Sequence, residues 1–258
     1  METFESSDGT IIAFERVGSG PAVVLVGGAL TDRTGGRDLA RALAPSCTVY
    51  CYDRRGRGDS GDSPPYQVEL EVEDLEALIL HTGSSAAVFA KSSGAALALL
   101  AAAEGVAMDK LVVFEPPYIV DDSRSLPPAD LPARVRGMIA SGRPGDAVER
   151  FLVESVGVPA EAVLGIEASP EWPAMQALAP TVLHDLAIMG DSSLPDGLSL
   201  ITVPTLVLDS SGSAPFLRAA AAAVAGVVPG ASYRTLECPN HGYDPDTAAE
   251  VVVEFLAT

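Results

Sequence analysis

The sequence contains few cysteines and few basic residues. Its three cysteines, Cys47, Cys51 and Cys238, are an odd number at spacings that match no metal site, so we expect reduced thiols rather than a disulfide framework. Only 16 Lys and Arg stand against 35 Asp and Glu, for a formal net charge of −19 at pH 7. A surface of this charge repels phosphate backbones and anionic lipid, so we expect neither nucleic acid nor membrane partners.

Long hydrophobic runs and targeting segments are also lacking. No apolar run approaches the roughly 20 residues that a membrane span needs, and the first residues carry no basic segment followed by an apolar one, which predicts no signal peptide. Together with the expected reduced thiols, these features predict a cytoplasmic protein. The sequence has no glycine-rich phosphate loop and no cluster with metal-ligand spacing, so we expect no cofactor and no metal.

The composition and patterning that are present predict one large α/β domain. Hydrophobic residues make up 48% of the 258 residues, enough for a sizeable core. Short apolar runs alternate with helical patterns, which predicts a mostly parallel, twisted sheet of about eight strands with helices on both faces. The expected strands cover residues 2–6, 11–17, 22–26, 48–53, 86–90, 110–115, 205–209 and 232–237.

The alternation of strands and helices lapses between residues 118 and 203. This stretch is rich in proline and glycine and carries helical patterns without a convincing strand. We therefore expect a core of residues 1–117 and 204–258, with a helical cap of residues 118–203 inserted after the sixth strand. Ligands of open α/β sheets bind at the carboxyl edge of the strands, where such a cap would lie. A small separate domain is the alternative.

A strand–turn–helix pattern surrounds Ser92. The apolar run before Lys91 breaks at Ser92, and Gly94 opens a stretch rich in alanine and leucine, both of which are strong helix formers. A nucleophile on such a strained turn needs small residues two positions before and after it, and Ala90 and Gly94 meet that need. The alternative is an ordinary strand–helix turn in which Ser93 caps the helix.

Several short motifs occur in an order that spans essentially the whole chain. They are Gly27-Gly28 after a strand, Tyr52 to Ser60, Ala90-Lys91-Ser92-Ser93-Gly94, Glu115-Pro116-Pro117, Val203-Pro204 before a strand, and Asn240-His241-Gly242 before the last helix. In this order they resemble the α/β-hydrolase superfamily. That superfamily holds esterases, lactonases and other hydrolases, with some lyases, cyclases and non-catalytic receptors, so the fold leaves the reaction open.

The resemblance implies roles for four residues. Ser92 would be the nucleophile and His241, in the loop after the last strand, its base. The backbone N–H groups of Ala29 and Ser93 would form the oxyanion hole.

The acidic partner of His241 is left open between two residues. The family's usual position, a few residues beyond the penultimate strand, reads Ser210-Ser211-Gly212 and holds no carboxylate. Asp209 stands at the end of that strand and is the preferred candidate, and Glu115 at the end of the preceding strand is the alternative. Lys91 also departs from the family, and we expect its side chain to turn away from the pocket and meet a carboxylate.

The resulting prediction is a serine hydrolase that cleaves a small, fairly apolar ester or lactone. Its expected partner is therefore a small-molecule substrate, and we expect a monomer or homodimer. The substrate pocket is predicted to include Leu30, Tyr118, Trp172 and His184, although each could simply join the cap to the core. The alternatives are a non-hydrolytic cyclase or lyase acting on a biosynthetic intermediate, and a catalytically silent ligand-binding protein.

Overall fold

The predicted α/β architecture is confirmed by a computed structural model, which describes residues 1–83 and 85–258. The described residues form one eight-stranded sheet in the order β1-β2-β4-β3-β5-β6-β7-β8. The pairings β1–β2 and β2–β4 are antiparallel, and all the others are parallel. The strands are β1 Glu2–Glu5, β2 Ile11–Gly18, β3 Ala22–Val26, β4 Thr48–Tyr52, β5 Ala87–Lys91, β6 Leu111–Phe114, β7 Thr205–Ser210 and β8 Ser232–Leu236.

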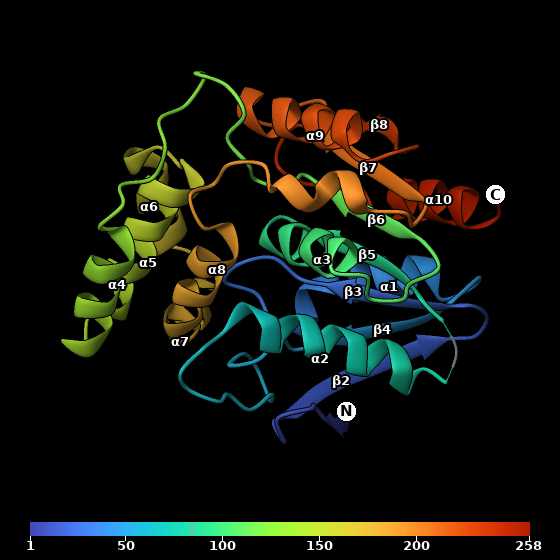
Figure 1. The fold of residues 1–258 in the computed structure, drawn as a ribbon. Coiled ribbons are helices and arrows are strands. Elements are labelled where there is room, and N and C mark those ends of the chain that lie inside the picture. Colours follow the sequence, from blue (N-terminus) through green and yellow to red (C-terminus); the bar gives the residue numbers. More distant parts are fainter. Residues whose placement is uncertain (84) are drawn as a thin grey trace.

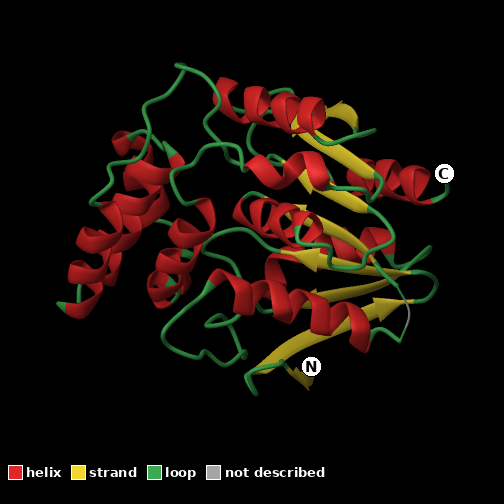
Figure 2. Cartoon of the chain, in the orientation of Figure 1, coloured by secondary structure: helices red, strands yellow, loops and turns green. Residues whose placement is uncertain are grey.

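Helices cover both faces of this sheet (Figures 1 and 2). One face packs against α1 (Arg37–Leu43) and α10 (Pro245–Leu256). The other packs against α2 (Val68–His81), α3 (Ser93–Ala103) and α9 (Pro215–Val227). Because side chains alternate along a strand, each central strand contributes to both layers. A strand buried on both faces reads as a continuous apolar run, and this is why the sequence pattern located the central strands.

The chain between β6 and β7 is helical throughout its described regular structure. Figure 1 shows its helices gathered beside one end of the sheet. They have an apolar cluster of their own, which also includes Leu30 from the loop after β3. The division into core and cap stays a prediction, and we call residues 115–204 the helical segment. Its α-helices are α4 Leu131–Ala140, α5 Pro144–Phe151, α6 Ala160–Glu167, α7 Trp172–Ala177 and α8 Val182–Met189.

A buried ion network ties this helical segment to the sheet. Asp185 of α8 is 1% exposed and accepts hydrogen bonds from Arg54 (3.0 Å), Arg57 (2.8 Å) and the Ser93 hydroxyl (2.7 Å). Arg54 also makes a two-pronged pair with Glu71 of α2, at 2.7 and 3.0 Å. Burial by itself raises the pKa of Asp185, but the charges of Arg57 and Arg54 outweigh it and the pKa is lowered. Asp185 therefore stays ionised between two fixed guanidinium groups.

The first turn of α3 lies directly on the end of β3. A Cβ atom added to Gly94 would lie 2.7 Å from the carbonyl oxygen of Val26 and closer still to that of Gly27. Both obstacles are backbone atoms, which cannot rotate away, so this approach requires glycine. The contact brings the loop after β3 beside the residues that follow β5.

The three cysteine thiols are free, with Cys47 and Cys51 buried and Cys238 half-buried. Burial raises the pKa of the Cys51 thiol to about 12, so it stays protonated and unreactive at neutral pH. Within residues 1–83 and 85–258, no three His, Cys, Asp or Glu side chains are grouped so that they could hold a metal ion. None of the described helices is long and apolar enough to cross a membrane.

The Asp185 network should stabilise the folded chain strongly. Asp185→Ala would leave Arg57 and one arm of Arg54 buried without a counter-charge, and we expect the free energy of unfolding to fall by about 3–5 kcal/mol. Urea unfolding measures the loss. Asp146→Ala is the matched control, because Asp146 pairs with Arg143 on the surface at 52% side-chain exposure and such pairs contribute little. Equal losses in the two variants would contradict the structural role given to Asp185.

The close approach at Gly94 predicts a second stability effect. Gly94→Ala should lower the thermal midpoint by several degrees, since overpacking costs about 1–3 kcal/mol and each kcal/mol moves the midpoint by about 2–4 °C at this size. Gly226→Ala in α9 is the control, because no atom lies within 4 Å of its added Cβ. There the better helix propensity of alanine should leave the midpoint unchanged or raise it. A Gly94→Ala variant as stable as wild type would rule out this contact as a constraint.

Candidate active site

Ser92 occupies a strained turn between β5 and α3. Its backbone angles are φ 56° and ψ −126°, a region that costs free energy for any residue with a side chain. Two backbone hydrogen bonds hold the turn. The Ser92 N–H donates to the carbonyl of Phe114 in β6 (2.9 Å), and the Ser92 carbonyl accepts from the N–H of Ala95 in α3 (2.8 Å). The Ser92 side chain makes no cap hydrogen bond, and the Ser93 hydroxyl donates to Asp185. Neither side chain is therefore used as an ordinary helix cap.

His241 and Glu115 meet beside this turn. His241 lies in the loop between β8 and α10, and its Nδ1 is hydrogen-bonded to Oε2 of Glu115. Glu115 directly follows β6, is fully buried, and has a positive φ of 48°. Its other carboxylate oxygen accepts from the backbone N–H of Ser210 at 2.7 Å. Both oxygens of this carboxylate are thus engaged, and the one facing His241 fixes the orientation of the ring.

Asp209, the preferred acid from the sequence, has different partners. Its Oδ2 accepts from the Tyr233 hydroxyl at 2.5 Å and from Arg218 of α9 at 3.3 Å. Side chains alternate along a strand, so Asp209 shares a face of β7 with Val207, which packs in the same core cluster as α9. The structure corrects the preference for Asp209, because the carboxylate that it brings to His241 is that of Glu115.

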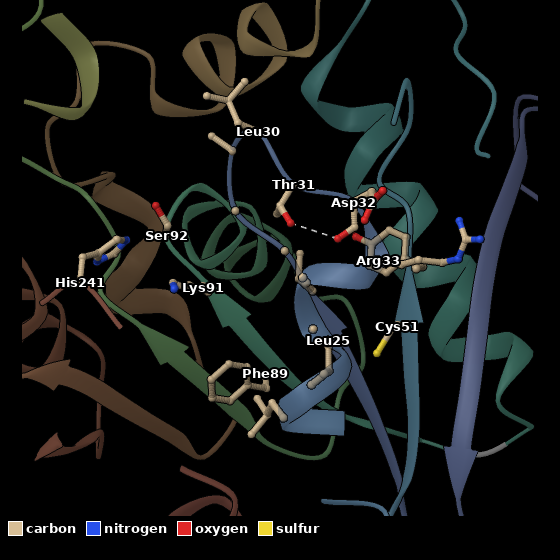
Figure 3. A pocket seen from close by; sticks show the side chains of 18 of the residues that line it. Leu25, Leu30, Thr31, Asp32, Arg33, Cys51, Phe89, Lys91, Ser92 and His241 are labelled. Carbon is tan, nitrogen blue, oxygen red and sulfur yellow. Dashed lines mark hydrogen bonds between the residues drawn. The ribbon is translucent and has the colours of Figure 1, made fainter. Parts of the chain in front are cut away.

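Ser92 and His241 line the same two cavities. The first cavity has a volume of about 280 Å³ and runs under the loop after β3, and the second has a volume of about 250 Å³ and opens toward α8 and α9. Figure 3 shows the His241 ring beside Ser92 at the first cavity. Within the part of the chain that the structure describes, the Ser92 hydroxyl makes no hydrogen bond. Its oxygen is therefore available to a molecule in either cavity.

Ala29 and Ser93 flank Ser92 as the resemblance implied. Ala29 lines both cavities and Ser93 lines the second. As the first residue of α3, Ser93 has a backbone N–H with no partner inside the helix. Gly28 brings the loop close to the serine, since a Cβ added to Gly28 would lie 3.1 Å from the Cβ of Ser92. Ala29 and Ser93, whose N–H groups the resemblance implies as oxyanion donors, thus both line a cavity that Ser92 lines.

Of the four residues predicted to line the pocket, the structure places Leu30 in the first cavity. The prediction is wrong for Tyr118, Trp172 and His184, since none of them lines either cavity. Tyr118 is 1% exposed and packs in the core beneath the sheet edge, and Trp172 packs inside the helical segment. His184 stacks on Tyr66 at 3.9 Å between ring centres, and burial lowers its pKa. Tyr118 and His184 thus join the helical segment to the core, and Trp172 packs within that segment.

The helical segment lines the cavities with residues that sequence analysis did not name. They are Phe151, Leu152, Ser155, Val156, Gly157, Val158, Asp185 and Ser192; Met175 and Met189, whose apolar type made them candidates for the pocket wall, line the cavities as well. The sequence pattern of residues 145–154 indicates a helix. It could not indicate which apolar residues lie at the end of that helix nearest Ser92.

Lys91 also departs from its predicted position. Its side chain lines the first cavity, with the ammonium 5.7 Å from the Phe114 ring centre and 5.3 Å from that of Tyr243. No ion pair or hydrogen bond to a carboxylate is formed by Lys91 within the described chain. The expectation that it turns away to meet a carboxylate is corrected, because strand alternation directs it into the layer that holds these two aromatic rings.

Comparison with known proteins supports the same fold. The crystal structure of an alpha/beta hydrolase from Sphaerobacter thermophilus DSM 20745 is 54% identical, with a TM-score of 0.96 over 99% of this chain and 100% of that one. A thermophilic esterase from Thermogutta terrifontis, solved with malate bound, and the enol-lactonase from Burkholderia xenovorans LB400 are both 21% identical over all of this chain. The alignments cover 98% of the esterase chain and 100% of the lactonase chain, with TM-scores of 0.78 and 0.70. At that identity they show the shared fold alone.

A shorter sequence match and a family match complete the comparison. The uncharacterized hydrolase YraK from Bacillus subtilis (strain 168) is 37% identical over 95 residues, which is 35% of this chain and 35% of that protein. The match thus spans about a third of that relative. Residues 23–255 match the alpha/beta hydrolase family, from the start of β3 to the last helix. Taken with the order of the strands and the turn at Ser92, this shows that the chain belongs to the alpha/beta hydrolase family.

Proposed function

We propose that the protein is a serine hydrolase that cleaves small, fairly apolar esters or lactones. Its family and the similar proteins support a hydrolase, and esterases and an enol-lactonase are among the similar structures. The observation that carries the narrower proposal is the hydrogen bond between His241 and buried Glu115, beside a serine held on a strained turn. This arrangement matches a nucleophile, a base and a group that orients the base.

The reaction would proceed in two halves. The Ser92 oxygen attacks the substrate carbonyl carbon while Nε2 of His241 takes the hydroxyl proton. The resulting oxyanion accepts hydrogen bonds from the N–H groups of Ala29 and Ser93, and donors of this kind lower the barrier by about 3–4 kcal/mol each. His241 then gives its proton to the leaving alkoxide, which departs as an alcohol. A water molecule, deprotonated by His241, cleaves the acyl-enzyme and releases the acid.

Glu115 would act through His241 and not on the substrate. As an acceptor at Nδ1 it holds the ring in the tautomer whose Nε2 can take the serine proton, and it stabilises the imidazolium that forms. The cyclase and lyase alternatives rest on the missing acid, on Lys91 and on the apolar cap. With Glu115 bound to His241, the missing acid no longer favours them over hydrolysis.

The cavity walls support a small and largely apolar substrate. Each cavity has a volume of only about 250–280 Å³, at or below the lower end of the range for drug-sized ligands. Beside Ser92 the first cavity is walled by Leu30, Phe151 and Leu152, and the second by Phe216 and Met189. Such walls favour a short hydrocarbon chain on either side of the scissile ester.

Ser92→Ala should abolish ester turnover and labelling by a fluorophosphonate probe, because the attacking oxygen is removed. The measurement is the rate with short p-nitrophenyl esters, alongside in-gel labelling. Ser141→Ala, at an exposed turn where the hydroxyl bonds to Gly137, should retain both signals. Turnover that persists in the Ser92→Ala variant would exclude the nucleophile assignment.

Glu115→Gln and Asp209→Asn should separate the two candidate acids. Glu115→Gln can hold the wrong histidine tautomer, and the corresponding change in a serine protease lowers kcat by about 10⁴-fold. Asp209→Asn should leave kcat near the wild-type value, since Asp209 contacts Tyr233 and Arg218. Steady-state kinetics at neutral pH, with folding checked by circular dichroism, measures both. A large loss in the aspartate variant alone would reverse the assignment.

A further inference from the structure

Lys91 places a positive charge in the wall of the first cavity, next to the proposed nucleophile. It is the last residue of β5 and immediately precedes Ser92. In the view of Figure 3 it lies between the Ser92–His241 pair and the apolar side chains of Phe89 and Leu25. Its ammonium lies over the rings of Phe114 and Tyr243, 5.7 and 5.3 Å from their centres.

The other charged groups of this cavity are already neutralised or engaged. Arg33 pairs with Asp53, Asp59 and Glu15. The carboxylate of Asp32 accepts from the backbone N–H (2.8 Å) and hydroxyl (2.6 Å) of Thr34.

The acidic residue whose charge acts most on Lys91 is Glu115, but its carboxylate oxygens are hydrogen-bonded to His241 and to the backbone N–H of Ser210. Of the two cationic side chains that line the cavity, Arg33 and Lys91, Lys91 is thus the one without an acidic partner in the described chain.

An ammonium group in this position is unfavourable unless something compensates for the water it has lost. Burial lowers the pKa of Lys91, and the charge of Glu115 opposes that shift. The two aromatic faces return part of the lost hydration energy. A carboxylate that entered the cavity would return more, because a charge-assisted hydrogen bond between ionised groups is stronger than a neutral one.

We propose that the Lys91 ammonium binds a carboxylate carried by the substrate, so that the site prefers carboxylate-bearing esters or lactones to neutral ones of the same length. This inference rests on the proposed serine hydrolase function and narrows its substrate class. The walls beyond Lys91 are apolar, with Leu25, Leu39 and Phe89. The substrate is therefore a short hydrocarbon chain with one ester and one carboxylate.

The strong negative charge of the whole protein does not oppose such binding at ordinary salt. At about 0.15 M ionic strength, charges on the surface are screened beyond about 8 Å. A ligand inside the cavity then responds mainly to the groups that line it. Among these, Lys91 is the cation without a carboxylate partner in the described chain, and Asp32, which accepts only from Thr34, is the acidic group.

The test compares matched substrates in wild type and Lys91→Met at 0.15 M salt. In the first pair, methyl valerate and monomethyl glutarate differ by a carboxylate on the acyl chain. In the second pair, propyl acetate and 3-acetoxypropanoate differ by a carboxylate on the alcohol. We expect the wild type to prefer the carboxylate member of at least one pair in kcat/KM. Lys91→Met should reduce that preference by roughly 10- to 100-fold, mainly through KM.

Lys110→Met is the matched control. Lys110 also lies over an aromatic ring, that of Phe255 at 5.0 Å, but it binds the carbonyl of Phe255 at 2.7 Å near the chain's last residues. Its removal should leave the substrate preference unchanged. Circular dichroism and thermal unfolding check that Lys91→Met is folded, and Lys91→Gln serves as a second neutral variant. Calorimetric titration with glutarate, bound by wild type and lost in both neutral variants, gives a measurement that needs no turnover.

The outcomes separate this inference from the function on which it rests. A wild type that shows no preference for the carboxylate in either pair overturns the inference without any variant, and hydrolysis of the neutral esters would then leave the hydrolase proposal standing. Equal loss of activity toward both members of each pair in Lys91→Met would assign Lys91 to supporting Ser92 or His241. A wild type that hydrolyses none of the esters and leaves Ser92 unlabelled overturns the proposed function itself.

Discussion

The strained backbone at Ser92 is the constraint on which the site depends. A residue with a side chain does not adopt φ 56° unless its surroundings leave it no alternative. Two features constrain this turn. Strand β5 pairs in parallel with β3 and β6, and α3 approaches the end of β3 closely at Gly94. The packing of the core therefore holds Ser92 in this turn, where the residue lines both cavities.

The same packing gathers the remaining groups of the site from distant parts of the chain. β6 pairs beside β5, which brings Glu115 next to the turn, and the loop after β8 carries His241 back to it. The helical segment contributes to the walls of both cavities, and Asp185 joins it to the turn through the hydroxyl of Ser93. The helical segment and the turn at Ser92 are thus linked by buried, charge-assisted hydrogen bonds. Such bonds fix geometry more tightly than apolar contact alone.

The cationic side chains near the cavity are of two kinds, arginines paired with carboxylates and a lysine without a carboxylate partner in the described chain. The arginines after β4 and in the loop after β3 are paired, so they serve the structure. Lys91 has aromatic rings in place of a carboxylate. A folded protein keeps such a group only at a cost in stability, and a cost of this kind is most often associated with binding or catalysis.

The sequence by itself determined the architecture, and it named Ser92 and His241, which the structure brings to the same cavities. Buried parallel strands appear in the sequence as short apolar runs, which located the central strands. The predicted bounds of all eight strands lie within one residue of the observed ones. Ser92 was found because small residues on both sides of it are a local requirement of the turn. His241 was found by its place in the order of motifs that resemble the family.

Only the tertiary structure decided which residues contact His241, line the cavities and surround Lys91. Asp209 and Glu115 end neighbouring strands, and which of them meets His241 depends on the face to which each side chain turns. Tyr118, Trp172 and His184 were assigned to the pocket because of their chemical type, but their burial against distant residues turned them elsewhere. The position of Lys91 was likewise hidden, since its lack of a carboxylate partner is a property of the whole fold. Contacts between residues far apart in the chain leave no periodic pattern in the sequence. For this physical reason, the contacts of the site residues follow from the tertiary structure alone.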